Sequence, residues 1–215
     1  MKRRAVILAA GEFPKKPYPL YLLDSADVIV CCDGAAAAFR RHFGDARLPD
    51  AVIGDLDSIS PSIRRHYADR IVQIEEQDDN DLTKALGHLT EHETGLEEIT
   101  ILGATGKRED HTIGNLGLLM EYTRMFQLGE RRVSAVSDFG TAFAITDSCD
   151  LHLGEGRRIS IFSADNSLRI TSAGLEWPLD HVVFDAWWKA TLNRTSEPIV
   201  SLHFNHPAPV LIMVD

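Results

Sequence analysis

Short apolar runs alternate with amphipathic stretches through the first 130 residues of the chain. The runs are four to six residues long, are rich in β-branched or small side chains, and occupy residues 5–10, 28–32, 51–54, 71–74 and 99–102. Apolar runs of this length without a polar face are typical of parallel strands that are buried on both sides. The pattern therefore predicts five strands of a parallel sheet.

Between these runs lie segments in which apolar residues recur at helical spacing. Leu82, Leu86 and Leu89 recur at the period of one helix face. The predicted helices cover residues 18–25, 35–43, 61–68, 81–93 and 113–127. Regular alternation of strand and helix predicts an α/β fold, a doubly wound, mostly parallel sheet with helices on both faces and right-handed crossovers.

The pattern changes after Gly129, where short strand-like runs follow one another without an amphipathic helix. These runs are residues 133–136, 142–146, 158–162, 168–171, 181–184, 199–204 and 210–214. Closely spaced strands separated by turn residues are typical of an antiparallel β-sandwich. We therefore expect an α/β domain over residues 1–130 and a β-sandwich domain over residues 131–215.

The composition narrows the range of partners. The 215 residues include 32 acidic and 22 basic side chains, which gives a formal net charge of −10. That charge disfavours nucleic acid as a partner, although a divalent cation can join acidic side chains to a nucleotide. The first apolar run is too short for a membrane span, and the three cysteines include no CxxC pair. We expect a cytoplasmic protein without a membrane partner.

Glycine and acidic residues gather where four predicted strands end. Asp33 and Gly34 follow the second run, residues 54–58 (GDLDS) the third, residues 75–81 (EEQDDND) the fourth and residues 103–111 (GATGKREDH) the fifth. Ligands of open α/β sheets bind beyond the carboxyl ends of the strands. The coincidence of four such endings predicts a ligand site at this edge.

Asp55 and Asp57 are the most specific indication of a ligand site at that edge. Residues two apart in an extended segment point the same way, so both carboxylates can bind one hard divalent cation. The alternative is an ordinary turn in which Ser58 caps the helix that begins near Pro61.

The other two acidic or glycine-rich segments also allow two interpretations. Residues 75–81 form either a solvated loop before a helix or part of the ligand site, in which Asp81 binds metal beside a phosphate-binding Lys84. Residues 103–108 do not match a Walker loop, because only two residues separate the glycines, but they can form an anion nest before a helix. Asp110 or Thr112 can instead be the N-cap of that helix.

In this order, the motifs resemble those of the thiamine pyrophosphokinase family. The resemblance is carried by residues 31–36 (CCDGAA), 49–58 (PDAVIGDLDS), 76–85 (EQDDNDLTKA), 103–111 (GATGKREDH) and 174–179 (GLEWPL). Ala35, Glu76 and Asn80 depart from the family pattern of Gly, Asp and Thr at these positions.

The resemblance implies Mg²⁺-dependent transfer of a pyrophosphoryl group from ATP to the hydroxyl of thiamine, which leaves AMP. It implies that residues 1–130 bind ATP and magnesium, that residues 131–215 bind thiamine and dimerise, and that thiamine lies at the interface of a homodimer. The catalytic acids are then Asp55, Asp57, Asp81 and Asp110, of which the first three bind metal. The residues assigned to ATP or phosphate are Asp33, Gly34, Gln77, Asp78, Thr83, Lys84, Gly103, Thr105, Gly106, Arg108 and His111.

Thiamine is an aromatic cation, so an aromatic platform suits it. Trp177 is the candidate platform, with Trp187 and Trp188 as alternatives and packing in the core as the competing interpretation. Ser196 lies in the stretch nearest to the family's second thiamine-binding segment, and we assign it to thiamine as well.

Two other functions are compatible with the same acids. One is a Mg²⁺-dependent nucleotide phosphohydrolase that uses water as the nucleophile. The other is a regulator that binds thiamine or a nucleotide without catalysis. Formation of AMP from MgATP, with and without thiamine, distinguishes the three.

Overall fold

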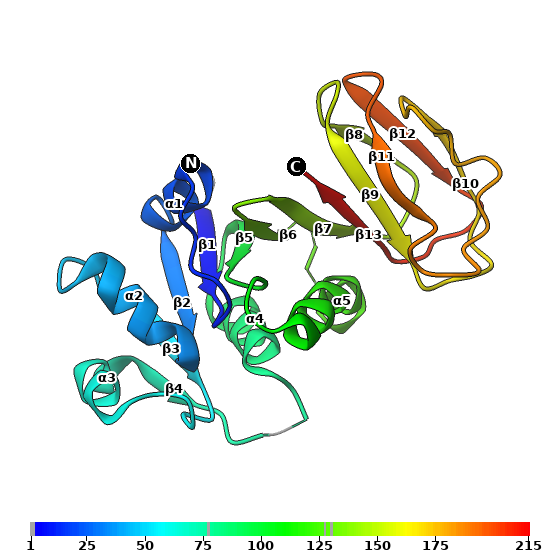
Figure 1. The fold of residues 1–215 in the computed structure, drawn as a ribbon. Coiled ribbons are helices and arrows are strands. Elements are labelled where there is room, and N and C mark those ends of the chain that lie inside the picture. The colour runs from blue at the N-terminus through cyan, green and yellow to red at the C-terminus, as the bar shows by residue number, and fades with distance from the viewer. Residues whose placement is uncertain (1–2, 77, 127, 130) are drawn as a thin grey trace. The chain divides into compact units, whose positions relative to one another are not determined.

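A computed structural model describes residues 3–76, 78–126, 128–129 and 131–215 of the chain (Figure 1). The chain forms two compact units. The first contains Met1–Leu118 and Phe126–Asp138, and the second contains Leu119–Met125 and Phe139–Asp215. No helix among the described residues is long and apolar enough to cross a membrane.

The first unit is built on a parallel sheet with the strand order β6-β5-β1-β2-β3-β4. Every neighbouring pair in this order is parallel. The strands are β1 (Arg3–Leu8), β2 (Val28–Cys32), β3 (Ala51–Gly54), β4 (Ile71–Gln73), β5 (Leu96–Leu102) and β6 (Arg132–Ser137).

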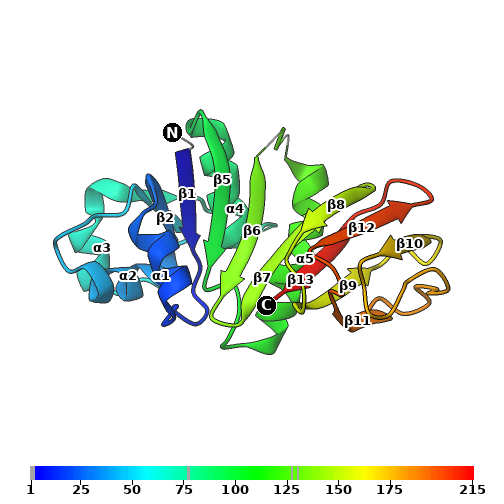
Figure 2. The same cartoon turned by 90° about the horizontal axis from the view of Figure 1, so that it is seen from above.

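Helices cover both faces of this sheet, as the sequence predicts. From β1 to β4 the chain moves in one direction across the sheet, and from β4 to β5 it returns past β1. Because the connections are right-handed, this reversal places α1 and α4 on opposite faces of the sheet (Figure 2). The helices are α1 (Pro17–Asp24), α2 (Ala36–Phe43), α3 (Pro61–His66), α4 (Asp81–His92) and α5 (Glu109–Met125), with 3₁₀ turns at η1 (Asp33–Ala35) and η2 (Ala68–Arg70).

The core of this unit fixes the strand ends in place. Phe39 and Tyr67 are almost fully buried against strand residues such as Ile29 and Val52. Their rings lie 6.4 Å apart, centroid to centroid, in an edge-to-face arrangement. Because α2 and the end of α3 pack on the same apolar cluster, the loops that follow β2 and β3 begin from a rigid base.

The second unit consists of two antiparallel sheets, with the strand orders β11-β9-β13-β7 and β10-β12-β8. These antiparallel pairings confirm the predicted antiparallel fold. Ile161, Leu202 and Ile212 belong to an apolar cluster to which both sheets contribute. The strands are β7 (Gly140–Ile145), β8 (Cys149–His152), β9 (Arg158–Ser163), β10 (Ile170–Ala173), β11 (Ala190–Arg194), β12 (Ile199–Phe204) and β13 (Val210–Val214).

The predicted division after residue 130 differs from the observed one. β6 pairs in parallel with β5, so it belongs to the first unit, which continues to Asp138. The sequence could not show this, because an apolar run does not reveal which strand it will pair with.

The predicted strand over residues 181–184 is wrong. The backbone amide of Val182 donates to the carbonyl of Leu179 in a turn, and Phe184 enters the core without strand pairing. β8 and β11 were not predicted, because their polar residues, such as Asp150 and Asn193, interrupt the apolar pattern.

Candidate active site

Three carboxylates meet at the ends of the adjacent strands β2 and β3. Asp33 follows β2, whereas Asp55 and Asp57 follow β3, and one oxygen from each lies within 4.8 Å of the other two. Asp33 is buried, Asp55 is half-buried and Asp57 is exposed. This gradation leaves the cluster open to solvent on one side, which a site for a metal–phosphate complex requires.

The loop after β3 is shaped by an unusual backbone conformation. Leu56 has a positive φ of 71° and is only 6% exposed. A non-glycine residue in the left-handed region costs free energy, which burial of this leucine side chain offsets. The turn brings the amide of Asp57 within 3.1 Å of Asp55 Oδ1. Ser58 donates from Oγ to Asp57 Oδ1, while Ser60 caps α3, so the capping role considered for Ser58 belongs to Ser60.

The close approach of the two strand ends also depends on Gly54. A Cβ at this position would lie 2.8 Å from Cγ of Asp33. Any side chain there would push Asp33 away from the loop that carries Asp55 and Asp57. The glycine before the two aspartates therefore has a steric role in gathering the carboxylates.

The electrostatics of this cluster favour a bound cation. Oδ2 of Asp33 is buried and has no hydrogen-bond partner among the described residues. Burial, aided by the charges of Asp55 and Asp57, raises the pKa of Asp33. Burial and the neighbouring charge of Asp33 raise the pKa of Asp81 to about 6. A hard divalent cation would satisfy the unpaired oxygen and relieve the repulsion, so the residues present fit Mg²⁺.

Asp81 and Lys84 lie on the first turns of α4, beside this cluster. Lys84 is buried, donates from Nζ to the carbonyl of Ile74 at 3.3 Å, and lowers the pKa of Asp81 through its charge. Within the described part of the chain they form no direct ion pair, so the surface-pair interpretation does not hold. Asn80 caps the helix by accepting from the amide and the hydroxyl of Thr83.

The loop after β5 is held against the loop after β1. Gly11 and Glu12 donate their backbone amides to the carbonyls of Gly103 and Thr105, at 2.7 and 2.8 Å. Gly106 has a positive φ of 96°, a conformation that glycine adopts without steric cost. The two loops thus form one continuous glycine-rich rim at the ends of β1 and β5.

Asp110 differs from the other predicted catalytic acids. Its carboxylate receives two hydrogen bonds from the guanidinium of Arg108 and one from the amide of His111, and these contacts lower its pKa to about 2. It lies in the first turn of α5, which begins at Glu109, earlier than predicted. The structure therefore presents Arg108 and Asp110 as a charged pair rather than as part of the three-carboxylate cluster.

The resemblance assigns Asp33 to ATP or phosphate, and in the structure its carboxylate lies within 4.8 Å of those of Asp55 and Asp57, to which the resemblance assigns the metal. The sequence shows that Asp33 directly follows a predicted strand, but only the structure shows that this strand, β2, pairs with β3. Gln77 lies outside the described residues. Asp78 is exposed, and its amide, like that of Asp79, donates to the carboxylate of Glu76.

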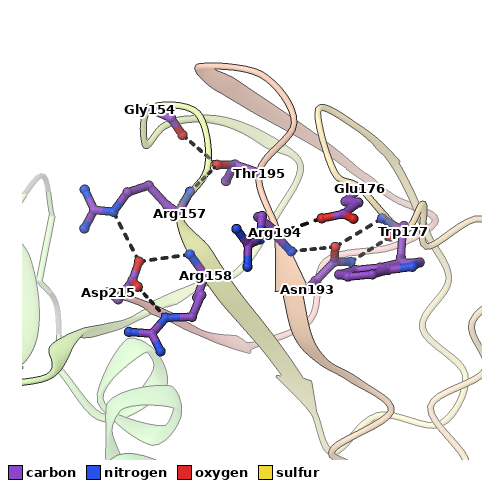
Figure 3. A network of polar contacts seen from close by, with 9 residues as sticks. All are labelled: Gly154, Arg157, Arg158, Glu176, Trp177, Asn193, Arg194, Thr195 and Asp215. Carbon is purple, nitrogen blue, oxygen red and sulfur yellow. Dashed lines mark hydrogen bonds and ion pairs between the residues drawn. The ribbon is translucent and has the colours of Figure 1, made fainter.

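The second unit presents Trp177 from a rigid backbone (Figure 3). The side chain of Asn193 accepts from the amide of Trp177 and donates to its carbonyl, at 3.2 and 2.7 Å. Trp177 is 56% exposed, so the core-packing interpretation is wrong. It borders a cavity of about 170 Å³ that Leu179, Lys189 and Leu192 also line.

The other tryptophans already have partners. Trp187 stacks on Phe162 with 5.3 Å between ring centroids, and the ammonium of Lys189 lies over the ring of Trp188. Among the described residues, Trp177 has no aromatic or cationic partner. Ser196 is exposed just after β11 and donates its amide to the carbonyl of Gly174.

The structure defines a two-unit protein. Its parallel α/β unit carries a carboxylate cluster at the strand ends, and its other unit is antiparallel β. Two family descriptions match these units: "Thiamin pyrophosphokinase, catalytic domain" over residues 20–128 and "Thiamin pyrophosphokinase, substrate-binding domain" over residues 140–210. The chain belongs to the thiamin pyrophosphokinase family.

Individual relatives agree with this assignment. Thiamine pyrophosphokinase 1 of Oryza sativa subsp. japonica is 29% identical over 205 residues, which cover 82% of this chain and 74% of the relative. Thiamine pyrophosphokinase 1 of Arabidopsis thaliana is 28% identical over 209 residues, covering 83% and 74%.

Solved structures share the fold. The thiamin pyrophosphokinase of Candida albicans superposes with a TM-score of 0.79 at 15% identity and covers 99% of this chain and 88% of its own. That of Bacillus subtilis gives 0.74 at 21% identity, with 99% and 98% covered.

Proposed function

We propose that this chain transfers a pyrophosphoryl group from ATP to the hydroxyl of thiamine, forming thiamine diphosphate and AMP with Mg²⁺ as the cofactor. The observation that carries the proposal is the cluster of Asp33, Asp55 and Asp57 at neighbouring strand ends, within a domain that matches the catalytic domain of the family. Pyrophosphoryl transfer depends chiefly on positioning and on neutralising phosphate charge.

The acids of the cluster would hold the metal. Asp33, Asp55 and Asp57 would bind Mg²⁺ directly, and Asp81 adjoins them through its interaction with Asp33. When bound, the cation neutralises phosphate oxygens of the donor. One of Asp33, Asp55 and Asp81 accepts a hydrogen bond from the attacking hydroxyl, which aligns its oxygen with the β-phosphorus. Lys84 and Arg108 supply further positive charge near the transferred group.

The experiment that tests the function compares MgATP with and without thiamine. Thiamine-dependent formation of equal amounts of AMP and thiamine diphosphate supports pyrophosphoryl transfer. Nucleotide hydrolysis that does not depend on thiamine would indicate the phosphohydrolase. Binding of either substrate without any product would indicate the regulator, and both outcomes overturn the proposal.

For thiamine recognition we propose Trp177 and Ser196. Trp177→Ala is expected to raise the Michaelis constant for thiamine about 3- to 30-fold, the range of a cation–π contact of about 0.5–2 kcal/mol, and to leave that for ATP nearly unchanged. Val183→Ala is a matched control, because Val183 is also exposed in the second unit but does not line the cavity. Thermal melting beside two-substrate kinetics makes the measurement. An unchanged Michaelis constant for thiamine in a folded Trp177→Ala variant would refute the role of Trp177 and leave Trp187 and Trp188 as the candidates.

We also propose that the active form is a cytoplasmic homodimer with thiamine at the subunit interface. Large apolar side chains, including Trp177, Trp188 and Leu192, are exposed on the second unit, and a stable interface would cover such surface. The expected dimer buries more than about 1,000 Å² in total. Sedimentation at assay concentration measures this, and a fully active monomer would contradict it.

A further inference from the structure

Two histidines form a pair on the surface of α4, near its C-terminal end. His88 and His92 are four residues apart, which places their side chains one above the other on one face of the helix. Their imidazole rings stack with 4.4 Å between centroids and 22° between planes. His88 is half-buried and His92 is exposed. The pair is separate from the carboxylate cluster, which adjoins Asp81 at the opposite end of the helix.

The hydrogen bonds of the pair leave nitrogen atoms available to a ligand. Nδ1 of His92 lies 2.9 Å from the carbonyl oxygen of His88 and donates to it, because a carbonyl oxygen can only accept. In the neutral ring, Nε2 of His92 therefore carries the free lone pair. Neither ring nitrogen of His88 has a hydrogen-bond partner within the part of the chain that the structure describes. Each ring can thus offer one nitrogen lone pair.

The surroundings of the pair disfavour a proton on His88 and attract a metal cation. Burial and the charge of His92 lower the pKa of His88, so this imidazole is neutral at pH 7, the form that binds metals. The charges of Glu91 and Glu93 act in the opposite direction on His88, which shows that negative charge lies close to the pair. The last turn of a helix also favours a cation, because the helix dipole is negative there.

The spacing of the pair is one that binds zinc in proteins. Two histidines at positions i and i+4 of a helix present both imidazoles to one metal ion, as in the H-E-x-x-H zinc motif. Residues 88–92 (HLTEH) have the same histidine spacing. Among the described residues, no third histidine, cysteine or carboxylate completes a metal-binding group with the pair. A structural zinc site has four protein ligands, so a metal held by this pair is exchangeable.

We propose that His88 and His92 bind one Zn²⁺ ion through one nitrogen of each imidazole, with water in the remaining positions. Imidazole nitrogen suits zinc and related transition metals, whereas Mg²⁺ prefers oxygen ligands. The pair therefore takes a different metal from the one proposed for the carboxylate cluster. Because the bound ion joins successive turns of α4, it stabilises the C-terminal part of the helix that begins at Asp81.

Calorimetry with ZnCl₂ tests the site in the full chain, prepared without a histidine tag. Mg²⁺ in large excess competes for the carboxylate cluster. His88→Gln and His92→Gln are each expected to weaken zinc binding at least about tenfold, because loss even of a residue that only supports a metal ligand costs about 10- to 100-fold. His42→Gln is the matched control, since His42 lies on α2 of the same unit and is paired with Asp24.

Copper identifies the atoms that bind the metal. Imidazole binds Cu²⁺ more tightly than Zn²⁺, and the electron paramagnetic resonance spectrum should show two nitrogen ligands in the wild type and one in each variant. Equal zinc affinity in the wild type and both folded variants would overturn the inference, as would a copper spectrum with oxygen ligands alone. His92 is exposed, so His92→Gln keeps the test valid if His88→Gln fails to fold. Neither measurement uses ATP or thiamine, so both are independent of the proposed function.

Discussion

Asp55→Asn and Asp57→Asn are each expected to lower turnover by about a thousandfold or more and to leave the fold intact. Each change removes one charge from a cluster of three carboxylates whose oxygens lie within 4.8 Å of one another. Loss of charge stabilisation by a bound metal costs several kcal/mol in the transition state. Folding should be retained, because an asparagine Oδ1 at position 55 can still accept from the amide of residue 57, and Asp57 is exposed.

Thiamine-dependent AMP formation, measured over a range of Mg²⁺ concentrations, checks this expectation. Asp69→Asn is the matched control, because Asp69 is an exposed acid of the same unit in η2, outside the cluster. Melting curves confirm that all three variants are folded. Wild-type turnover in both folded cluster variants would disprove the metal-binding role of these acids.

Gly11→Ala is expected to destabilise the protein by about 3 kcal/mol or more and to abolish activity. A Cβ at Gly11 would lie 2.2 Å from the carbonyl oxygen of Gly103 and 2.5 Å from that of Thr105. Both are backbone atoms in the rim at the ends of β1 and β5, so no side-chain rotation can relieve the overlap. Overpacking of this kind typically costs about 1–3 kcal/mol, and more where backbone must move.

Gly114→Ala is the same substitution, but we expect it to stabilise the protein. Gly114 lies within α5, and a Cβ there would meet no atom within 4 Å. The substitution should stabilise the protein by about 0.5–1 kcal/mol, because alanine loses less conformational freedom in a helix than glycine. Urea unfolding of the two variants makes the comparison. Equal stability of Gly11→Ala and the wild type would show that the rim is not rigid.

Local sequence pattern predicted some secondary-structure elements correctly and others not. β2 and β3 have the predicted bounds, because continuous apolar runs flanked by polar residues are local signals. α4 begins at Asp81 as predicted, since Asn80 provides a local cap. The strand over residues 181–184 failed because Phe184 is buried through tertiary packing and not through a ladder of backbone hydrogen bonds.

Some features of the candidate site could likewise be predicted from the sequence, and others could not. The motifs at four strand ends and their likeness to one family were readable from residue type and spacing alone. The grouping of Asp33 with Asp55 and Asp57 was not, because it depends on the pairing of β2 with β3 and on the space left by Gly54. The exposure of Trp177 was also hidden, since a tryptophan in a strand-rich segment packs in the core as readily as it faces solvent.

The sequence by itself determined the strand and helix alternation, the change to antiparallel strands and the acidic character of one sheet edge. These follow from periodicity and composition, which act over a few residues. Only the tertiary structure decided that β6 joins the parallel sheet and which carboxylates share one point in space. Those facts arise from strand order and close packing between residues far apart in the chain, and no local pattern encodes them.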